Sequence, residues 1–147
     1  MLKIIPPVYF CISLFLSIVL NYAAPVAPII VFPYTCSGFV VMWLGFVLLG
    51  LARRLFKINN IPLRPGEEVA VLLVGGPYKF TRNPIYLGFT IILIGASISL
   101  GTLTSWAGPI AFWLVINSIF IPFEEKKLES AFGKRYIEYK QKVRRWL

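Results

Sequence analysis

The sequence contains no histidine and only two cysteines among its 147 residues. Without an imidazole, no mechanism can use histidine as its base or metal ligand, and two cysteines alone make a poor metal site. Cys11 and Cys36 are expected near opposite ends of a first pair of helices, so we expect them to stay unpaired and to serve in apolar packing. No metal cofactor is expected.

Charged residues are absent from two long blocks of the chain. None occurs between Ile4 and Ala52, and none between Asn83 and Phe123. A spanning helix needs roughly 20 apolar residues to cross about 30 Å of hydrocarbon, so each block is long enough for two spans. The sequence therefore predicts an all-α integral membrane protein with four transmembrane helices in two antiparallel hairpins. A cytoplasmic central loop and a C-terminal amphipathic helix complete this prediction.

The predicted helices cover about 8–24, 34–52, 84–103 and 106–123. Prolines interrupt the first block after residue 24, and the turn of the second block, at 101–109, is short enough to predict a close hairpin. Small residues such as Gly95 and Ser97 would let helix backbones approach each other, and Gly101 would serve either packing or the turn. We treat residues 1–147 as a single membrane domain, with an N-terminal hairpin at about 1–52 and a core at 53–147.

The positive charge is confined to three places: Lys3, the central loop and the tail after Glu124. With four spans these places fall on one side, and the positive-inside rule puts both termini and the loop in the cytoplasm. The net charge of +9 is then mainly a topology signal, and no nucleic-acid partner is expected. The first apolar stretch is expected to remain as a helix, because Tyr22 and Pro25 flank its candidate cleavage site poorly.

Residues 75–88, "GGPYKFTRNPIYLG", gather turn-forming and polar residues between the two blocks. Asn83 and Pro84 suit the N-cap and first position of a helix. That role leaves the clustering of Tyr78, Arg82 and Tyr86 unexplained, although tyrosine and arginine also favour membrane interfaces. The apolar hexamer at 69–74 is too short to span, so it lies at the interface or covers a ligand.

The tail carries apolar residues at helical spacing, which predicts an amphipathic helix with a candidate break at Gly133. They are Leu128, Phe132, Tyr136, Tyr139, Val143 and Trp146. Glu124 and Glu125 stand at the predicted end of the fourth helix, where the helix dipole disfavours negative charge. They either hold a cationic group or pair with Arg82 or the tail lysines. Because helical neighbours point about 100° apart, we expect only one of them to face the site.

These two segments together resemble the isoprenylcysteine carboxyl methyltransferase family and its phospholipid-methylating relatives. The shared pattern is G-P-Y-x-x-x-R-[HN]-P-x-Y-x-G, then about forty apolar residues, then E-E-x-x-L-x-x-x-F-G-x-x-Y-x-x-Y, and it covers residues 70–145. The resemblance implies a membrane methyltransferase that uses S-adenosylmethionine at the cytosolic face and acts on a lipophilic small molecule or lipidated substrate within membrane lipid.

The resemblance also implies a set of site residues. Glu124 is expected near the substrate, and Arg82 is expected to pair with the cofactor's carboxylate or a lipid phosphate. The expected cofactor contacts are Ala70, Val71, Leu72, Leu73, Tyr78, Asn83, Pro84, Ile85, Tyr86 and Glu125.

Two departures from the family pattern bear on mechanism. Asn83 stands where the family commonly has histidine, and asparagine can donate a hydrogen bond but cannot act as a base. A carboxylate or thiolate acceptor needs no base, whereas an amine must first lose a proton, for which Glu124 is the candidate acceptor. Phe120 stands where the eukaryotic enzymes carry an arginine, which leaves a prenylcysteine carboxylate without an obvious partner.

Two alternatives remain open at this stage. Membrane sterol reductases show a similar R-H-x-x-Y-x-G and F-G-x-x-W-x-x-Y pattern but bind NADPH; the E-E pair and the Y-x-x-Y spacing favour the methyltransferase. The other alternative is a non-catalytic membrane scaffold, which Asn83 and Phe120 keep open.

Overall fold

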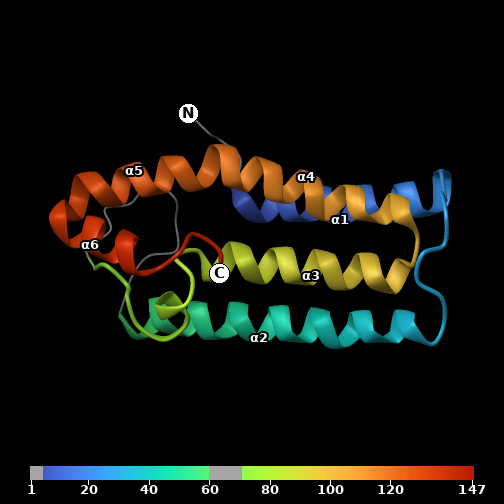
Figure 1. The fold of residues 1–147 in the computed structure, drawn as a ribbon, viewed down its shortest axis with the longest axis horizontal. Helices are drawn as coiled ribbons and strands as arrows, with labels where there is room; N and C mark the ends of the chain where they lie inside the picture. The colour runs from blue at the N-terminus through green and yellow to red at the C-terminus, as the bar shows by residue number, and fades with distance from the viewer. Residues whose placement is uncertain (1–4, 60–70) are drawn as a thin grey trace.

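The computed structural model describes residues 5–59 and 71–147 as a set of long helices running side by side (Figure 1). The α-helices are α1 (Pro6–Ala23), α2 (Ser37–Ile58), α3 (Pro84–Leu100), α4 (Ala107–Val115), α5 (Ile121–Phe132) and α6 (Lys134–Lys142). Short 3₁₀ turns form η1 (Tyr34–Cys36), η2 (Gly76–Lys79) and η3 (Leu103–Trp106), and a π-helical segment, η4 (Ile116–Phe120), joins α4 to α5. The described residues contain no β-strand, only one bridge between Pro28 and Thr102.

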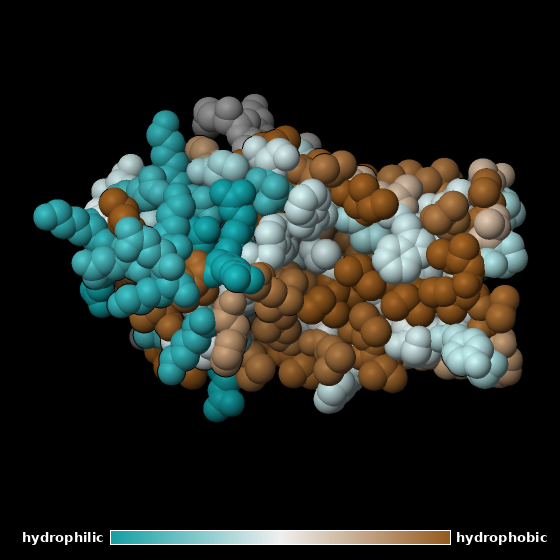
Figure 2. Space-filling model, in the orientation of Figure 1, coloured by the Kyte–Doolittle hydropathy of each residue, from teal (hydrophilic) through white to brown (hydrophobic). Residues whose placement is uncertain are grey.

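Three helical stretches are long and apolar enough to cross a membrane. They are Pro6–Ala23, Tyr34–Ile58 and Leu103–Phe132, and α3 is a shorter apolar helix of 17 residues. Figure 2 shows hydrophobic residues covering most of the length of the molecule and hydrophilic residues gathered at the end formed by α5 and α6. The chain is thus an all-helical integral membrane protein, as predicted.

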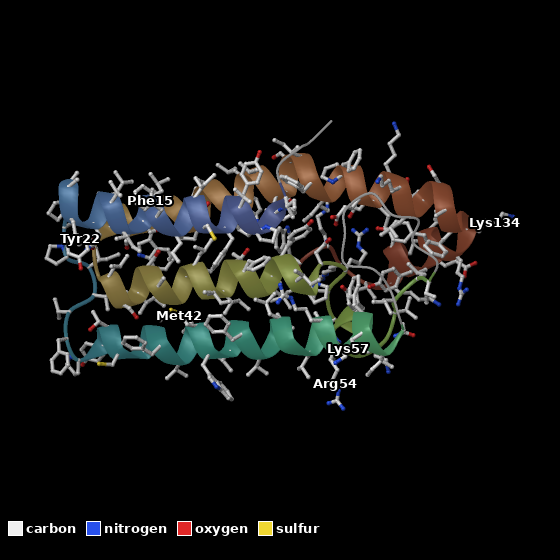
Figure 3. All side chains as sticks on the ribbon, turned by 180° about the vertical axis from the view of Figure 1, so that it is seen from behind. Phe15, Tyr22, Met42, Arg54, Lys57 and Lys134 are labelled. Atoms are coloured by element: carbon white, nitrogen blue, oxygen red, sulfur yellow. The ribbon has the colours of Figure 1, made fainter. Side chains whose placement is uncertain are left out.

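The outer surface of this body is apolar because it faces lipid. Phe15 on α1 is 69% exposed and points away from the neighbouring helices (Figure 3). Cys11 and Cys36 are both unpaired, as predicted, but they are exposed rather than packed in the core. Figure 3 also shows Arg54, Lys57 and Lys134 at the same end of the molecule, which separates the cations from the apolar body.

Glycines decide which helices pack together. A Cβ on Gly95 of α3 would lie 2.6 Å from the carbonyl oxygen of Gly38 on α2, and one on Gly45 would lie 2.6 Å from Ile92 Cγ1. The most extensive helix contact is therefore between α2 and α3, followed by that between α1 and α4. The close approach predicted at Gly95 is confirmed. The last two spans also contact each other, as Phe89 of α3 packs on Phe112 of α4 and Ser97 Oγ donates to the Ser105 carbonyl, but this contact is less extensive than that of α2 with α3.

The fourth predicted helix does not end at residue 123. It passes through the π-helical segment and continues as α5 to Phe132, where Gly133 at φ +51° ends it. The residues after Phe123 are charged but favour helix, so only glycine breaks the run. Glu124 and Glu125 therefore lie within a helix, and the expectation that they stand at its C-terminus is wrong.

Two clusters form the described core. The larger joins α2, α3, α4, η4 and α5, with side chains of α1 packed against it, and contains Leu49, Tyr86, Phe89, Ile92, Leu93, Phe112, Ile116, Phe120 and Ile121. In the smaller, Leu72 packs with Tyr136 and Tyr139 of α6, surrounded by Leu128, Phe132 and Val143. The amphipathic tail and its break at Gly133 are thus confirmed, except that Trp146 packs against the larger cluster.

Candidate functional site

The turn that precedes α3 brings several polar groups to the hydrophilic end of the bundle. Gly76 adopts φ +55° at the start of η2, a conformation that glycine adopts without strain. Asn83 and Pro84 occupy the N-cap and first helical positions, as predicted. The Asn83 side chain, however, makes no capping bond: its Nδ2 donates to the carbonyl oxygen of Arg145 over 3.0 Å.

A hydrogen bond connects the two segments that the sequence singled out. The Tyr86 hydroxyl, on α3, donates to Glu124 Oε1, on α5, over 2.6 Å. A hydrogen bond of this length to a carboxylate is of the strong, charge-assisted kind. Since the Tyr86 side chain is buried, the bond fixes the Glu124 carboxylate within the bundle rather than at its surface.

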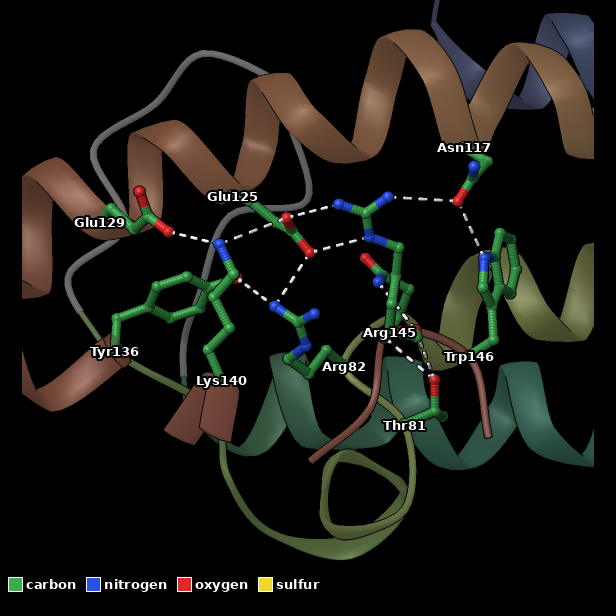
Figure 4. A network of polar contacts seen from close by, with 10 residues as sticks. Thr81, Arg82, Asn117, Glu125, Glu129, Tyr136, Lys140, Arg145 and Trp146 are labelled. Carbon is green, nitrogen blue, oxygen red and sulfur yellow. Dashed lines mark hydrogen bonds and ion pairs between the residues drawn. The ribbon is translucent and has the colours of Figure 1, made fainter. Parts of the chain in front are cut away.

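Glu125 also points inward, toward a cluster of cations (Figure 4). Its carboxylate lies 2.9 Å from Arg82 Nη1, 2.8 Å from Arg145 Nη2 and 3.8 Å from Lys140 Nζ. Both glutamates thus meet protein groups, and which of them faces a bound ligand stays a prediction. The C-terminal segment folds back beside α5, so a residue 100° around the helix from Glu124 also meets protein instead of solvent.

The C-terminal segment after α6 is held by backbone and side-chain bonds from the turn before α3 and from η4. The backbone N–H of Arg82 donates to the Arg144 carbonyl over 3.0 Å, and Thr81 Oγ1 donates to the Arg145 carbonyl over 3.1 Å. Asn117 Oδ1 accepts from Arg145 Nη1 at 3.3 Å and from Trp146 Nε1 at 3.0 Å.

Arg145 and Asn117 escaped the sequence-based prediction. The signal for Asn117 was available, because a polar side chain inside an apolar span is costly unless it is paired or functional. It lies in the π-helical segment, and such segments are frequent at functional sites. Arg145 carried no comparable signal, because it follows the periodic part of the tail.

Three tyrosines line the side of the cluster nearest α6. The Tyr139 hydroxyl donates to the Tyr78 carbonyl over 2.6 Å, and Arg82 Nη1 donates to the Tyr136 hydroxyl over 3.5 Å. Burial raises the pKa of Tyr139 to about 12 and also raises the pKa of Tyr78. Both phenols are therefore neutral at physiological pH and act as hydrogen-bonding groups and aromatic surfaces.

The remaining predicted cofactor contacts are spread more widely. Leu72 packs with Tyr136 and Tyr139 next to the cation cluster, whereas Val71 is exposed. Ile85 packs against the larger core cluster, and Pro84 is fully buried at the start of α3. Ala70 lies outside the described residues. Within residues 5–59 and 71–147, no group of three histidine, cysteine or acidic side chains is placed to hold a metal ion.

Comparison with known proteins places this arrangement in a family. The phospholipid methyltransferase family matches residues 33–135. An uncharacterised protein of Haemophilus influenzae is 51% identical over 63 residues, which are 43% of this chain and 100% of that protein. Protein-S-isoprenylcysteine O-methyltransferase B of Arabidopsis thaliana is 39% identical over 80 residues, covering 52% of this chain and 39% of the plant protein.

A solved structure shows the same fold. The eukaryotic intramembrane Ras methyltransferase, an isoprenylcysteine carboxyl methyltransferase, matches with a TM-score of 0.67 and 26% sequence identity. The match covers 93% of this chain and 50% of that one. The chain thus spans about half the length of the solved relative and about two fifths of the plant protein. On the family match and the shared fold, the chain belongs to the phospholipid methyltransferase family.

Proposed function

We propose that this protein transfers a methyl group from S-adenosylmethionine to a lipophilic acceptor at the cytosolic face of the membrane. The observation that carries the proposal is the Tyr86–Glu124 hydrogen bond, which joins the two motif segments at the hydrophilic end of an apolar bundle. Relatives named as O-methyltransferases support the reaction class. Family membership favours methyl transfer over the reductase, although the reductase and the non-catalytic scaffold remain outcomes of the test below.

The described residues fit the cofactor in chemical type. Glu124 offers a carboxylate to a sulfonium or ammonium group, and the rings of Tyr78 and Tyr86 offer π-faces that attract a cation. Leu72 supplies an apolar wall beside Tyr136 and Tyr139. The Nε of Arg82 is buried without a hydrogen-bond partner among the described residues, so it has a donor to spare for a bound molecule.

The protein's part in the reaction is to position and desolvate the reactants. S-adenosylmethionine, when bound, supplies an activated methyl group whose leaving group is a neutral thioether. Tyr86 orients the Glu124 carboxylate, which would take a proton from an amine acceptor or order the head group of an acceptor that is already an anion. Since the chain has no histidine, Glu124 is the base that this arrangement offers.

The acceptor is proposed to be lipophilic because the site adjoins apolar surface. A groove of about 410 Å³ between α3 and α4 is lined by Thr90, Ile94, Trp106, Pro109, Ile110, Trp113 and Leu114. Its Trp113 ring lies 6.3 Å from the ring of Trp146, next to Arg145. A hydrocarbon chain in this groove would lie along α4 and point toward the C-terminal segment that carries Arg145 and Trp146. Phe120 packs against Tyr9, with ring centroids 5.2 Å apart, so it lies in the core and offers no charge to a prenylcysteine.

We further infer that all four apolar helices span, with both termini and the central loop on the cytosolic side. The 17 residues of α3 cover about 25 Å at 1.5 Å per residue. This length suffices to span the membrane because the glycines of α2 hold α3 against the other helices of the bundle. An impermeant maleimide should label a Lys134→Cys variant from the cytosolic side and leave the native Cys36 unlabelled. The reverse pattern would invert the topology.

Calorimetry on the purified protein in detergent tests the proposed reaction class. Wild type should bind S-adenosylmethionine and S-adenosylhomocysteine saturably and NADPH not at all. Tyr86→Phe removes only the hydroxyl that holds Glu124, and Glu124→Gln removes only the charge; both should weaken binding or turnover. Glu138→Gln, an exposed carboxylate on α6, is the matched control and should behave as wild type.

The outcomes separate the alternatives. Binding of NADPH alone would move the protein to the reductases. Failure of a folded sample to bind any of the three compounds would leave a scaffold without turnover. If binding is established, incubation with methyl-labelled cofactor and membrane extracts would identify the acceptor.

A further inference from the structure

The cation cluster around Glu125 carries more positive than negative charge. Three cations, Arg82, Arg145 and Lys140, surround one carboxylate. Lys140 is balanced separately by Glu129, whose Oε1 lies 2.6 Å from its Nζ. Arg82 and Arg145 therefore share the single charge of Glu125, and one positive charge is left over among the described residues.

Burial makes this imbalance costly. The side chains of Arg82 and Glu125 are only 9% and 8% exposed, and that of Arg145 is 33% exposed. A buried charge without a partner loses its hydration, and no ion pair offsets the free-energy cost. Arg82 also has a donor to spare, since its buried Nε meets no acceptor within the described part of the chain. Two independent observations, the excess positive charge and the unpaired donor, thus favour binding of an anion here.

The geometry favours a planar anion with two oxygens. Arg145 already grips Glu125 through two bonds, Nε to Oε1 at 3.2 Å and Nη2 to Oε2 at 2.8 Å. Its Nη1 is held by Asn117 at 3.3 Å, so the guanidinium is fixed in orientation before any ligand arrives. The unmet donor is on Arg82, whose Nη1 meets Glu125 and Tyr136 but whose Nε has no partner among the described residues. A guanidinium edge of this kind suits a carboxylate oxygen, whereas a lysine would offer only a point charge.

We propose that Arg82 and Arg145 together form a carboxylate-binding site, with Asn117 as the residue that positions Arg145. This inference rests on the proposed function only for the source of the carboxylate. It could be the amino-acid carboxylate of the cofactor or a carboxylate on the acceptor itself. In the second case, Arg145 supplies the positive charge that Phe120 lacks. Either group would lie beside Glu125, the residue that follows Glu124 on α5, and therefore near the proposed reaction.

Paired ligands and variants test the first source. S-adenosylhomocysteine and 5′-methylthioadenosine share the adenosyl thioether, but only the former has the carboxylate. Wild type should bind S-adenosylhomocysteine at least about tenfold more tightly than 5′-methylthioadenosine, because a hydrogen bond between charged groups contributes at least about that factor to affinity. In Arg145→Gln that ratio should collapse toward one. In Arg145→Lys, which keeps the charge but loses the two parallel bonds to Glu125, the ratio should be intermediate.

The chain offers a matched control at the neighbouring position. The Arg144 side chain is exposed, so Arg144→Gln removes the same group from the same segment and should keep the wild-type ratio. Asn117→Leu should lower the ratio without removing any charge, which a merely structural role for Arg145 would not predict. Melting curves of each variant establish that it is folded before its affinity is compared.

The second source is tested with S-farnesylthioacetic acid and its carboxamide as ligands. A preference for the acid that is lost in Arg145→Gln but kept in Arg144→Gln would assign the site to the acceptor. If neither adenosyl compound binds, the proposed function fails, while this second comparison still tests the site. If Arg145→Gln changes no carboxylate preference in either comparison, the arginines serve only as an internal ion pair and the inference is wrong.

Discussion

Replacing Glu125 by alanine should destabilise the protein more than removing any exposed carboxylate. The Glu125 carboxylate is 8% exposed and lies 2.9 Å from Arg82 Nη1 and 2.8 Å from Arg145 Nη2. Removing it would leave Arg82, 9% exposed, with no counter-charge among the described residues. Breaking a buried pair in this way costs about 3–5 kcal/mol. Because a third of Arg145 remains accessible to water, we expect the lower end, about 3 kcal/mol.

The melting temperature of detergent-solubilised protein measures this effect. A loss of about 3 kcal/mol corresponds to a fall of roughly 6–12 °C for a domain of this size. Glu129→Ala is the matched control, because Glu129 also pairs with a cation at 2.6 Å but is 39% exposed. An exposed ion pair is worth about 0–1 kcal/mol, so its melting temperature should fall by at most a few degrees. A smaller loss in Glu125→Ala than in Glu129→Ala would refute the reasoning from burial.

Three further predictions concern packing, titration and backbone conformation. Gly95→Ala would put a Cβ 2.6 Å from the Gly38 carbonyl oxygen and should lower the free energy of unfolding by about 1–3 kcal/mol through overpacking. In the control, Gly50→Ala, the new Cβ meets nothing within 4 Å, so thermal unfolding should show a neutral or slightly stabilising effect. Burial raises the pKa of Tyr139 from 10.0 to about 12, so its contribution is full below pH 10 and lost as the pH rises through 12; melting temperatures between pH 9 and 12 should fall less steeply in Tyr139→Phe. Gly133→Ala would force an alanine into φ +51°, ψ −126° and should cost about 1–3 kcal/mol, and a melting temperature equal to that of wild type would show that the tail rearranges instead.

The sequence predicts those features of the fold that depend on a single local signal. Gly133 broke the tail as predicted, because no other residue between α5 and α6 favours a turn. The end of the fourth helix was misjudged because Glu124 looked like the start of a polar segment, whereas charged residues continue a helix as readily as apolar ones. The pairing of α2 with α3 depended on glycines in both helices, and a pattern in one segment cannot reveal which neighbour it faces.

The contacts among the predicted site residues depend on elements that are distant in the sequence. Tyr86 and Glu124 were named separately, and the hydrogen bond between them emerges only when α3 and α5 are in place. Arg145 could not be predicted, since its role depends on a segment that folds back without periodic structure. The roles assigned to the predicted residues in binding and catalysis stay predictions until ligands are measured.

The π-helical segment at Ile116–Phe120 has a consequence for how this helix can vary. A π-bulge holds one residue more than the α-helix it interrupts, and it therefore offsets the phase of α5 from that of α4 by about 100°. The offset sets the angle around the helix axis between the membrane-facing side of α4 and the two inward-facing glutamates of α5. An uninterrupted α-helix would place the same residues at a different angle. Deleting one residue from this segment would keep every side chain of the site and rotate both glutamates off their partners. The exposed positions of the segment, Ser118 and Ile119, should accept substitutions far more readily than the segment accepts a change in length.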